Sequence, residues 1–192
     1  MDIRRVVRMT GPGPSVVTST VWATIIAAAD DVDADLVVFD LMMLAHGWAL
    51  KHWHFAPALT IDYATLTGAA RVALGPQLPP LYTDDEALAA DYAAAAAAIG
   101  DPVWRMPLWS GYESALGSDI ADMTNDPDGW AQAGSVTAAL FLKRFAPTCG
   151  AWAHLDVFAW NSKARPGWPV GGELQGVRAA YALLKQRFSV NG

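Results

Sequence analysis

The 192 residues contain a single cysteine, Cys149, which excludes both an internal disulfide framework and a zinc site built on paired thiolates. Lysine and arginine together number only 13, the formal net charge is −6 and no basic run occurs, so we expect no nucleic-acid partner. No apolar stretch reaches the roughly 18 residues that a membrane-spanning helix requires. The sequence therefore predicts a protein that has no membrane partner.

What the chain does have is enough apolar material for one compact core. Hydrophobic residues make up 53% and charged residues 17%, which excludes disorder as a general description. A chain of this length buries roughly 70% of its unfolded surface when it folds as one domain. We expect residues 1–30 to form a divergent N-terminal lead and residues 31–192 to form the folded domain.

The N-terminal lead leaves one targeting question open. Arg4, Arg5 and Arg8 precede a mostly apolar run, residues 16–29, in an order that imitates a secretory signal. The Gly-Pro segment 11–14 separates these charges from the run. We therefore favour an ordinary lead and a cytoplasmic protein.

Capping signals and apolar spacing predict three helices. Thr83, with Glu86 three residues later, forms a capping box before an alanine-rich helix that ends at Gly100. Ser135 is a candidate cap for a second helix. Apolar residues recur at intervals of three and four over 174–188, which indicates a third.

Short segments of strand character lie between the predicted helices. Residues 59–63 alternate in polarity, and residues 152–160 are rich in aromatic and β-branched side chains. Strands separated by helices are typical of an α/β fold. We expect a mixed, largely parallel sheet flanked by helices.

Three segments, in the same order and at the same spacing, are similar to a known family. The first is 61–69 (IDYATLTGA), the second runs from WRMPL at 104–108 to SDIAD at 118–122, and the third is WAHLD at 152–156. Together they resemble the catalytic domain of the cytosol (leucine) aminopeptidase family over about 31–188. The resemblance implies that this region is the C-terminal part of that catalytic domain.

The resemblance also implies an activity and its partners. Members of this family are metalloproteases that remove N-terminal amino acids from peptides, and they usually assemble as homohexamers in the cytoplasm. Two divalent ions, Mn²⁺ or Zn²⁺, share a bridging water that attacks the scissile carbonyl. Such an ion pair lowers the pKa of the bound water and neutralises the oxyanion as it forms.

The family's metal motif matches an acidic cluster near the start of the expected domain. Without gaps, the match places Asp31 and Asp33 on two metal-binding carboxylates, and Asp35 on an arginine that holds a bicarbonate. A gapped match would instead place Asp33 and Asp35 on the ligands and delete the arginine, which is absent either way. The family's lysines and remaining aspartates come from further upstream, whereas residues 1–30 contain no lysine. We therefore assign no catalytic residue. Two interpretations stay open: a metal-dependent aminopeptidase, or a non-catalytic peptide-binding or assembly module derived from one.

The resemblance further implies that Thr65, Leu66 and Gly68 contact the substrate. The alternative interpretation is a strand-to-helix turn in which Gly68 permits a tight backbone. His52 and His54 form a His-x-His pair with no third ligand nearby in the sequence, and we expect a surface or interface role for them.

His154 and Asp156 share one face of a predicted strand, which raises the possibility of a serine-hydrolase triad with Ser135. We do not expect one, because Ser135 lies at the start of a helix of structural character.

Overall fold

The computed structural model describes residues 36–40, 58–125, 127, 129–146 and 148–188, with only the backbone described for 36–40. No helix in this part of the chain is long and apolar enough to cross a membrane. The elements, in chain order, are β1 (Leu36–Asp40), β2 (Leu59–Ala64), α3 (Gly68–Leu74), β3 (Pro80–Tyr82), α4 (Glu86–Ile99), β4 (Trp104–Arg105), the 3₁₀ helix η1 (Ser110–Leu116), α5 (Gly134–Lys143), β5 (Ala151–Asp156), β6 (Trp160–Asn161), β7 (Gly171–Gly172) and α6 (Val177–Phe188).

Five strands form one mixed sheet in the order β1-β2-β5-β3-β4. β1 and β5 both run parallel to β2, and β3 runs parallel to β4, whereas β3 and β5 are antiparallel. The mixed, largely parallel sheet predicted from the sequence is therefore confirmed. β5 comes late in the chain and lies between strands that precede it.

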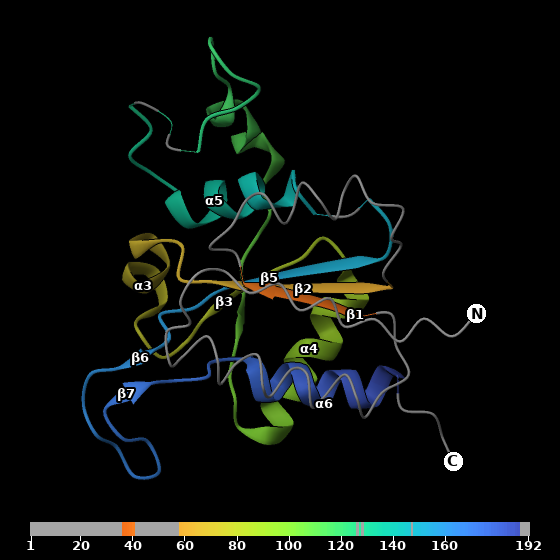
Figure 1. The fold of residues 1–192 in the computed structure, drawn as a ribbon, viewed down its shortest axis with the longest axis vertical. Coiled ribbons are helices and arrows are strands. Elements are labelled where there is room, and N and C mark those ends of the chain that lie inside the picture. Colours follow the sequence, from red (N-terminus) through yellow and green to blue (C-terminus); the bar gives the residue numbers. More distant parts are fainter. Residues whose placement is uncertain (1–35, 41–57, 126, 128, 147, 189–192) are drawn as a thin grey trace.

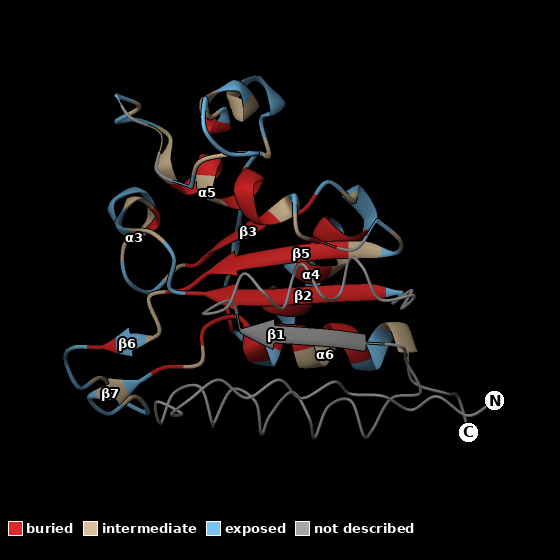
Figure 2. Ribbon diagram, turned by 45° about the horizontal axis from the view of Figure 1, so that its top comes forward, coloured by how far each residue is buried: buried red, intermediate tan, exposed pale blue. Residues whose placement is uncertain are grey.

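Helices cover both faces of this sheet (Figure 1). Leu59, Ile61 and Tyr63 belong to an apolar cluster with residues of α4 and α6, while Tyr82 and Trp152 belong to a second cluster with residues of α5 and η1. Every residue of β2 is buried, which Figure 2 shows in red. The alternating polarity along β2 therefore does not mean that one face contacts solvent, because both faces of the strand are covered.

The start of α4 differs from the sequence prediction. Asp85, not Thr83, is the N-cap, and its carboxylate accepts a hydrogen bond from the backbone N–H of Leu88 at 2.8 Å. Thr83 accepts from the N–H of Asp85 instead, which forms a turn ahead of the helix. The predicted end is confirmed, because Gly100 adopts the left-handed conformation with φ +65°.

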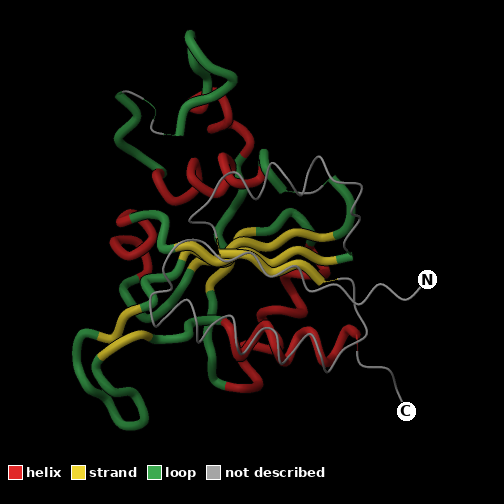
Figure 3. The backbone as a smooth tube through the Cα atoms, viewed as in Figure 1, coloured by secondary structure: helices red, strands yellow, loops and turns green. Residues whose placement is uncertain are grey.

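The start of α5 also differs from the prediction. Ala133, with φ +52°, is the N-cap and forms no side-chain capping bond. Ser135 lies in the first turn, where its hydroxyl is 2.6 Å from that of Tyr82. The Ser135 hydroxyl, which the sequence predicted to cap the helix, bonds instead to a residue of another element, Tyr82. Between β4 and α5 the chain is mostly loop, apart from η1 (Figure 3).

Candidate functional site

The candidate site lies where β2 and β5 end. Because these neighbouring strands are parallel, their carboxyl ends meet at one edge of the sheet, where α/β proteins commonly bind ligands. β2 ends at Ala64, and a short loop of Thr65, Leu66 and Thr67 leads into α3. We call this the 65–67 loop. β5 ends at Asp156, which pairs in register with Ala64.

Asp156 fixes the 65–67 loop. One carboxylate oxygen accepts the backbone N–H groups of Leu66 at 3.0 Å and Thr67 at 3.3 Å, and the other accepts the Thr67 hydroxyl at 2.7 Å. The Thr67 oxygen in turn caps α3 by accepting the N–H of Ala70. Asp156 is only 3% exposed, so these bonds form away from bulk solvent. A single buried side chain thus sets both the loop and the start of the helix.

The residues predicted to contact substrate lie together in and beside this loop. Thr65 is exposed, Leu66 is 37% exposed and Gly68 is the exposed first residue of α3. A Cβ atom added to Gly68 would meet nothing within 4 Å. The alternative role for Gly68, enabling a tight backbone, therefore has no steric basis here.

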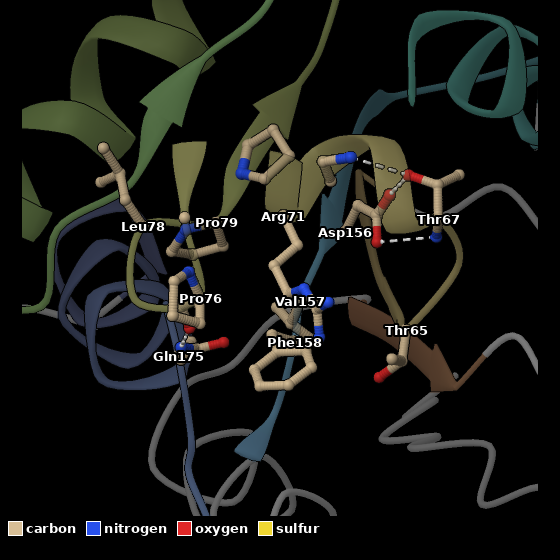
Figure 4. A pocket seen from close by; sticks show the side chains of 13 residues that line it. Thr65, Thr67, Arg71, Pro76, Leu78, Pro79, Asp156, Val157, Phe158 and Gln175 are labelled. Atoms are coloured by element: carbon tan, nitrogen blue, oxygen red, sulfur yellow. Dashed lines mark hydrogen bonds between the residues drawn. The ribbon is translucent and has the colours of Figure 1, made fainter. Parts of the chain in front are cut away.

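The 65–67 loop borders a shallow, partly open pocket with about 290 Å³ of empty space, a figure that includes open solvent. Figure 4 shows Arg71 and Phe158 between a proline-rich wall, which includes Pro76, and the Asp156–Thr67 pair. The Arg71 guanidinium lies 5.0 Å from the centre of the Phe158 ring. Aromatic, proline and charged groups thus meet beside the loop.

A polar network lies buried behind the site. The Asp62 carboxylate bonds to His154 Nδ1 at 2.5 Å and accepts the Trp152 indole N–H at 2.6 Å. His154 therefore pairs with Asp62 rather than with Asp156, and its Nε2 has no partner among the described residues. The Ser135 hydroxyl bonds to Tyr82, and Asp156 to the 65–67 loop, so Ser135, His154 and Asp156 are not joined as a hydrogen-bonded triad.

Tyr82 joins this network to the site electrostatically. Its ring stacks on His154 with centroids 5.9 Å apart. Burial raises the pKa of Tyr82 to about 12; the charge of Asp156 adds to the rise and the hydrogen bond with Ser135 opposes it. Tyr82 is therefore a neutral phenol at physiological pH, and it does not serve as a base.

Comparison with known proteins decides the family. The family described as "Cytosol aminopeptidase family, catalytic domain" matches residues 13–181. The chain belongs to the cytosol aminopeptidase family. This confirms the resemblance found in the sequence motifs.

Individual relatives of this aminopeptidase-family chain are longer than it is. The probable cytosol aminopeptidase of Syntrophotalea carbinolica is 37% identical over 177 residues, which cover 91% of this chain and 33% of that protein. The probable cytosol aminopeptidase of Burkholderia mallei is 42% identical over 158 residues, or 81% of this chain and 29% of that protein. The chain thus spans about a third of the length of the curated relatives that it matches.

Solved structures agree with this fold assignment. The crystal structure of the cytosol aminopeptidase from Coxiella burnetii aligns with a TM-score of 0.66 at 38% identity, covering 89% of this chain and 34% of that one. The bottromycin maturation enzyme BotP in complex with Mn aligns with a TM-score of 0.64 at 33% identity, covering 74% of this chain and 31% of that one. The α/β architecture is therefore that of aminopeptidase domains.

The described residues of this aminopeptidase-family chain do not form a metal centre by themselves. None of their His, Cys, Asp and Glu side chains gather in a group of three or more that could hold an ion. The predicted metal positions Asp31 and Asp33 lie outside the described residues, as do His52 and His54.

Sequence reasoning located the 65–67 loop but missed the groups that hold it. It noted Asp156 only as a neighbour of His154, and it gave Arg71 and Phe158 no role. Asp156 stands 89 residues from Thr67, and no local pattern reports a contact of that separation. The available signal was the predicted parallel sheet, which brings the ends of separate strands to one edge.

Proposed function

We propose that this chain forms the peptide-binding edge of a metal-dependent aminopeptidase, which removes N-terminal residues from peptides. The observation that carries the proposal is the 65–67 loop, which Asp156 holds at the end of β2 within the IDYATLTGA motif. Membership of the cytosol aminopeptidase family supports the same function.

The loop is suited to binding the donor groups of a peptide. Since the amides of Leu66 and Thr67 already donate to Asp156, the loop offers a ligand mainly its carbonyl oxygens, the backbone N–H and hydroxyl of Thr65, and the Leu66 side chain. A free N-terminal amine and the adjacent peptide N–H are donors that match such acceptors. Holding the loop before the peptide arrives lowers the ordering cost of binding.

We assign the metal-binding role to Asp31 and Asp33. Carboxylate oxygens suit hard divalent ions, and the BotP relative has been solved with Mn. When bound, Mn²⁺ or Zn²⁺ would polarise a carbonyl oxygen that reaches it and would supply a water of lowered pKa. Both residues precede β1, whose first residue, Leu36, pairs with Leu59 at the other end of β2 from the loop. The metal assignment therefore rests on the sequence motif and has a test of its own.

That test is calorimetric titration with Mn²⁺ and Zn²⁺. We expect the double variant Asp31→Asn/Asp33→Asn to bind either ion at least tenfold more weakly, because it removes two ligand charges. The control is Asp84→Asn/Asp91→Asn, which removes the same charge from carboxylates that pair with Lys143 and Arg187. Equal affinity in the wild type and in Asp31→Asn/Asp33→Asn would refute the metal assignment.

A second candidate function is peptide binding without catalysis. Asp35 favours it, because it places an acid where the family motif has an arginine, which reverses the charge offered to an anion. Loss of one such transition-state contact commonly costs a hundred- to thousandfold in rate.

One assay separates the two candidates. Both predict that leucylglycine shifts the NMR resonances of Leu66 and Thr67. Hydrolysis of leucine p-nitroanilide with added Mn²⁺, abolished by chelator, would establish the aminopeptidase; binding without hydrolysis would establish the module. If the loop resonances do not respond to the peptide, both candidates are wrong.

A further inference from the structure

Arg71 stands apart from the other arginines of the described residues. Each of the others lies within 4 Å of a carboxylate: Arg105, Arg144, Arg165, Arg178 and Arg187. Arg71 forms no ion pair within the described part of the chain, although it lines the pocket beside the 65–67 loop. Its guanidinium instead lies 5.0 Å from the centre of the Phe158 ring. Among the described residues, no carboxylate therefore pairs with this charged donor group.

The pocket also contains a carboxylate, that of Asp156, but it forms no ion pair with Arg71. Asp156 also lines the pocket, but its two oxygens accept the bonds from Leu66 and Thr67. Three donors leave about one acceptor site on this carboxylate, but among the described residues no ion pair joins it to Arg71. The pocket thus holds one buried negative charge, that of Asp156, and one exposed positive charge, that of Arg71, which lies against an aromatic face and can reach a ligand.

The guanidinium fork fits a carboxylate better than it fits other peptide groups. Its paired N–H groups match both carboxylate oxygens, and a charge-assisted pair of this kind is stronger than a neutral hydrogen bond. Arg71 is exposed and Phe158 is half-buried, so a carboxylate can reach the guanidinium from solvent.

Spacing along α3 puts this charge within reach of a short peptide. Thr67 is the extended N-cap of α3 and Arg71 is the fourth residue of that helix, so a rise of about 1.5 Å per residue separates the two by roughly 6 Å along the helix axis. An extended dipeptide spans about 7 Å. A dipeptide whose amine end is at the 65–67 loop can therefore bring its carboxylate to Arg71.

We propose that Arg71 binds the C-terminal carboxylate of a short peptide, so that this site selects dipeptides with a free C-terminus. Phe158 holds the guanidinium in place, and the 65–67 loop receives the other end of the ligand. The inference rests on the proposed peptide-binding function and adds a specificity determinant to it.

The test compares leucylglycine with leucylglycinamide, which differ in the C-terminal charge. We expect wild-type protein to bind leucylglycine about tenfold more tightly, by calorimetry or by NMR titration, since charge-assisted hydrogen bonds contribute on this scale. Arg71→Gln should remove that preference while leaving the affinity for the amide unchanged. Arg71→Lys should keep part of it, because it retains the charge without the fork.

Arg178→Gln is the matched control. Its guanidinium also lies 5.0 Å from an aromatic centroid, that of Trp168, so the substitution removes the same charge and a similar ring contact outside the pocket. We expect this variant to retain the wild-type preference. Loss of the preference in both variants would show a general charge effect and would overturn the proposal.

Peptide length gives a further readout. Leucyl-pentaglycine carries the same carboxylate beyond the reach of Arg71, and we expect its affinity to equal that of the amide. If wild-type protein binds leucylglycine and leucylglycinamide equally, the role of Arg71 is wrong while the peptide site stands. If neither peptide binds, the proposed function fails and this inference fails with it.

Discussion

Asp156 shows how a single carboxylate at the end of a strand can hold a loop that lies far earlier in the sequence. Its contacts with Leu66 and Thr67 cross about 90 residues of sequence, with separations of 90 and 89. The motif resemblance identified the loop because the residues that define it are contiguous. The role of Asp156 in holding the loop could not be predicted from a contiguous motif, because a long-range hydrogen bond produces no periodic pattern in the sequence.

Replacing Asp156 therefore has a specific expected effect. Asp156→Ala leaves the N–H groups of Leu66 and Thr67 without an acceptor, and we expect the free energy of unfolding to fall by about 2–4 kcal/mol. Hydrogen exchange should accelerate at these two amides more than in the centre of β2.

The control for this change is Asp119→Ala, at an exposed site. We expect it to change the unfolding free energy by less than about 0.5 kcal/mol, as measured by urea denaturation. Unaltered exchange at Leu66 and Thr67 in Asp156→Ala would mean that the loop does not depend on this carboxylate.

At the scale of helices and strands, the sequence predicted the elements better than their ends. The strand around 59–63 and the helix over 174–188 correspond to β2 and α6, because burial on one or both faces leaves an apolar pattern. The predicted caps at Thr83 and Ser135 were wrong. In both cases the hydroxyl has another partner, the N–H of Asp85 or the phenol of Tyr82, and a cap rule cannot foresee such competition.

The junction before α6 offers a prediction for a single element. Gly176 has φ +74°, and an added Cβ would lie 2.6 Å from the Leu155 side chain in the core. We expect Gly176→Ala to lower the free energy of unfolding by about 2–4 kcal/mol, combining backbone strain with overpacking.

Gly167→Ala separates these two causes. Gly167 has a similar φ of +79°, but its added Cβ would meet nothing within 4 Å. Gly167→Ala should lower the free energy of unfolding by about 1 kcal/mol, which is the contribution of backbone strain alone. Equal urea midpoints for the two variants would rule out the clash with Leu155.

For the molecule as a whole, composition and the alternation of elements predicted the fold class but not the strand order. Local patterns report which residues are buried, whereas the order β1-β2-β5-β3-β4 depends on how separate elements pack. The two apolar clusters, one on each sheet face, follow from that order.

Buried tyrosines predict how the stability of the whole molecule depends on pH. Burial raises the pKa of Tyr63 and Tyr92 well above the ordinary value of 10, and that of Tyr82 to about 12. The unfolded chain loses these protons more readily than the folded one, so the stabilisation is complete below about pH 10 and is lost as the pH rises further. Tyr82 alone should account for about 1.4 kcal/mol of that loss by pH 11, and for about twice as much above pH 12.

Urea denaturation at pH 8, 9.5, 10.5 and 11 measures this dependence. In Tyr82→Phe we expect the alkaline loss of stability to be smaller than in the wild type, with the difference growing as the pH rises. Parallel curves for the two proteins would show that Tyr82 does not titrate differently in the folded and unfolded states.

The position of β5 bears on how the chain acquires its fold during synthesis. This strand, Ala151–Asp156, joins β2 to β3, so the middle of the sheet cannot form until the ribosome has released the chain as far as Asp156. Until then the nascent β2 and β3 each lack a neighbour and display open backbone groups, a state prone to mispairing with other chains. Cells that make this protein would benefit from chaperone protection during that interval.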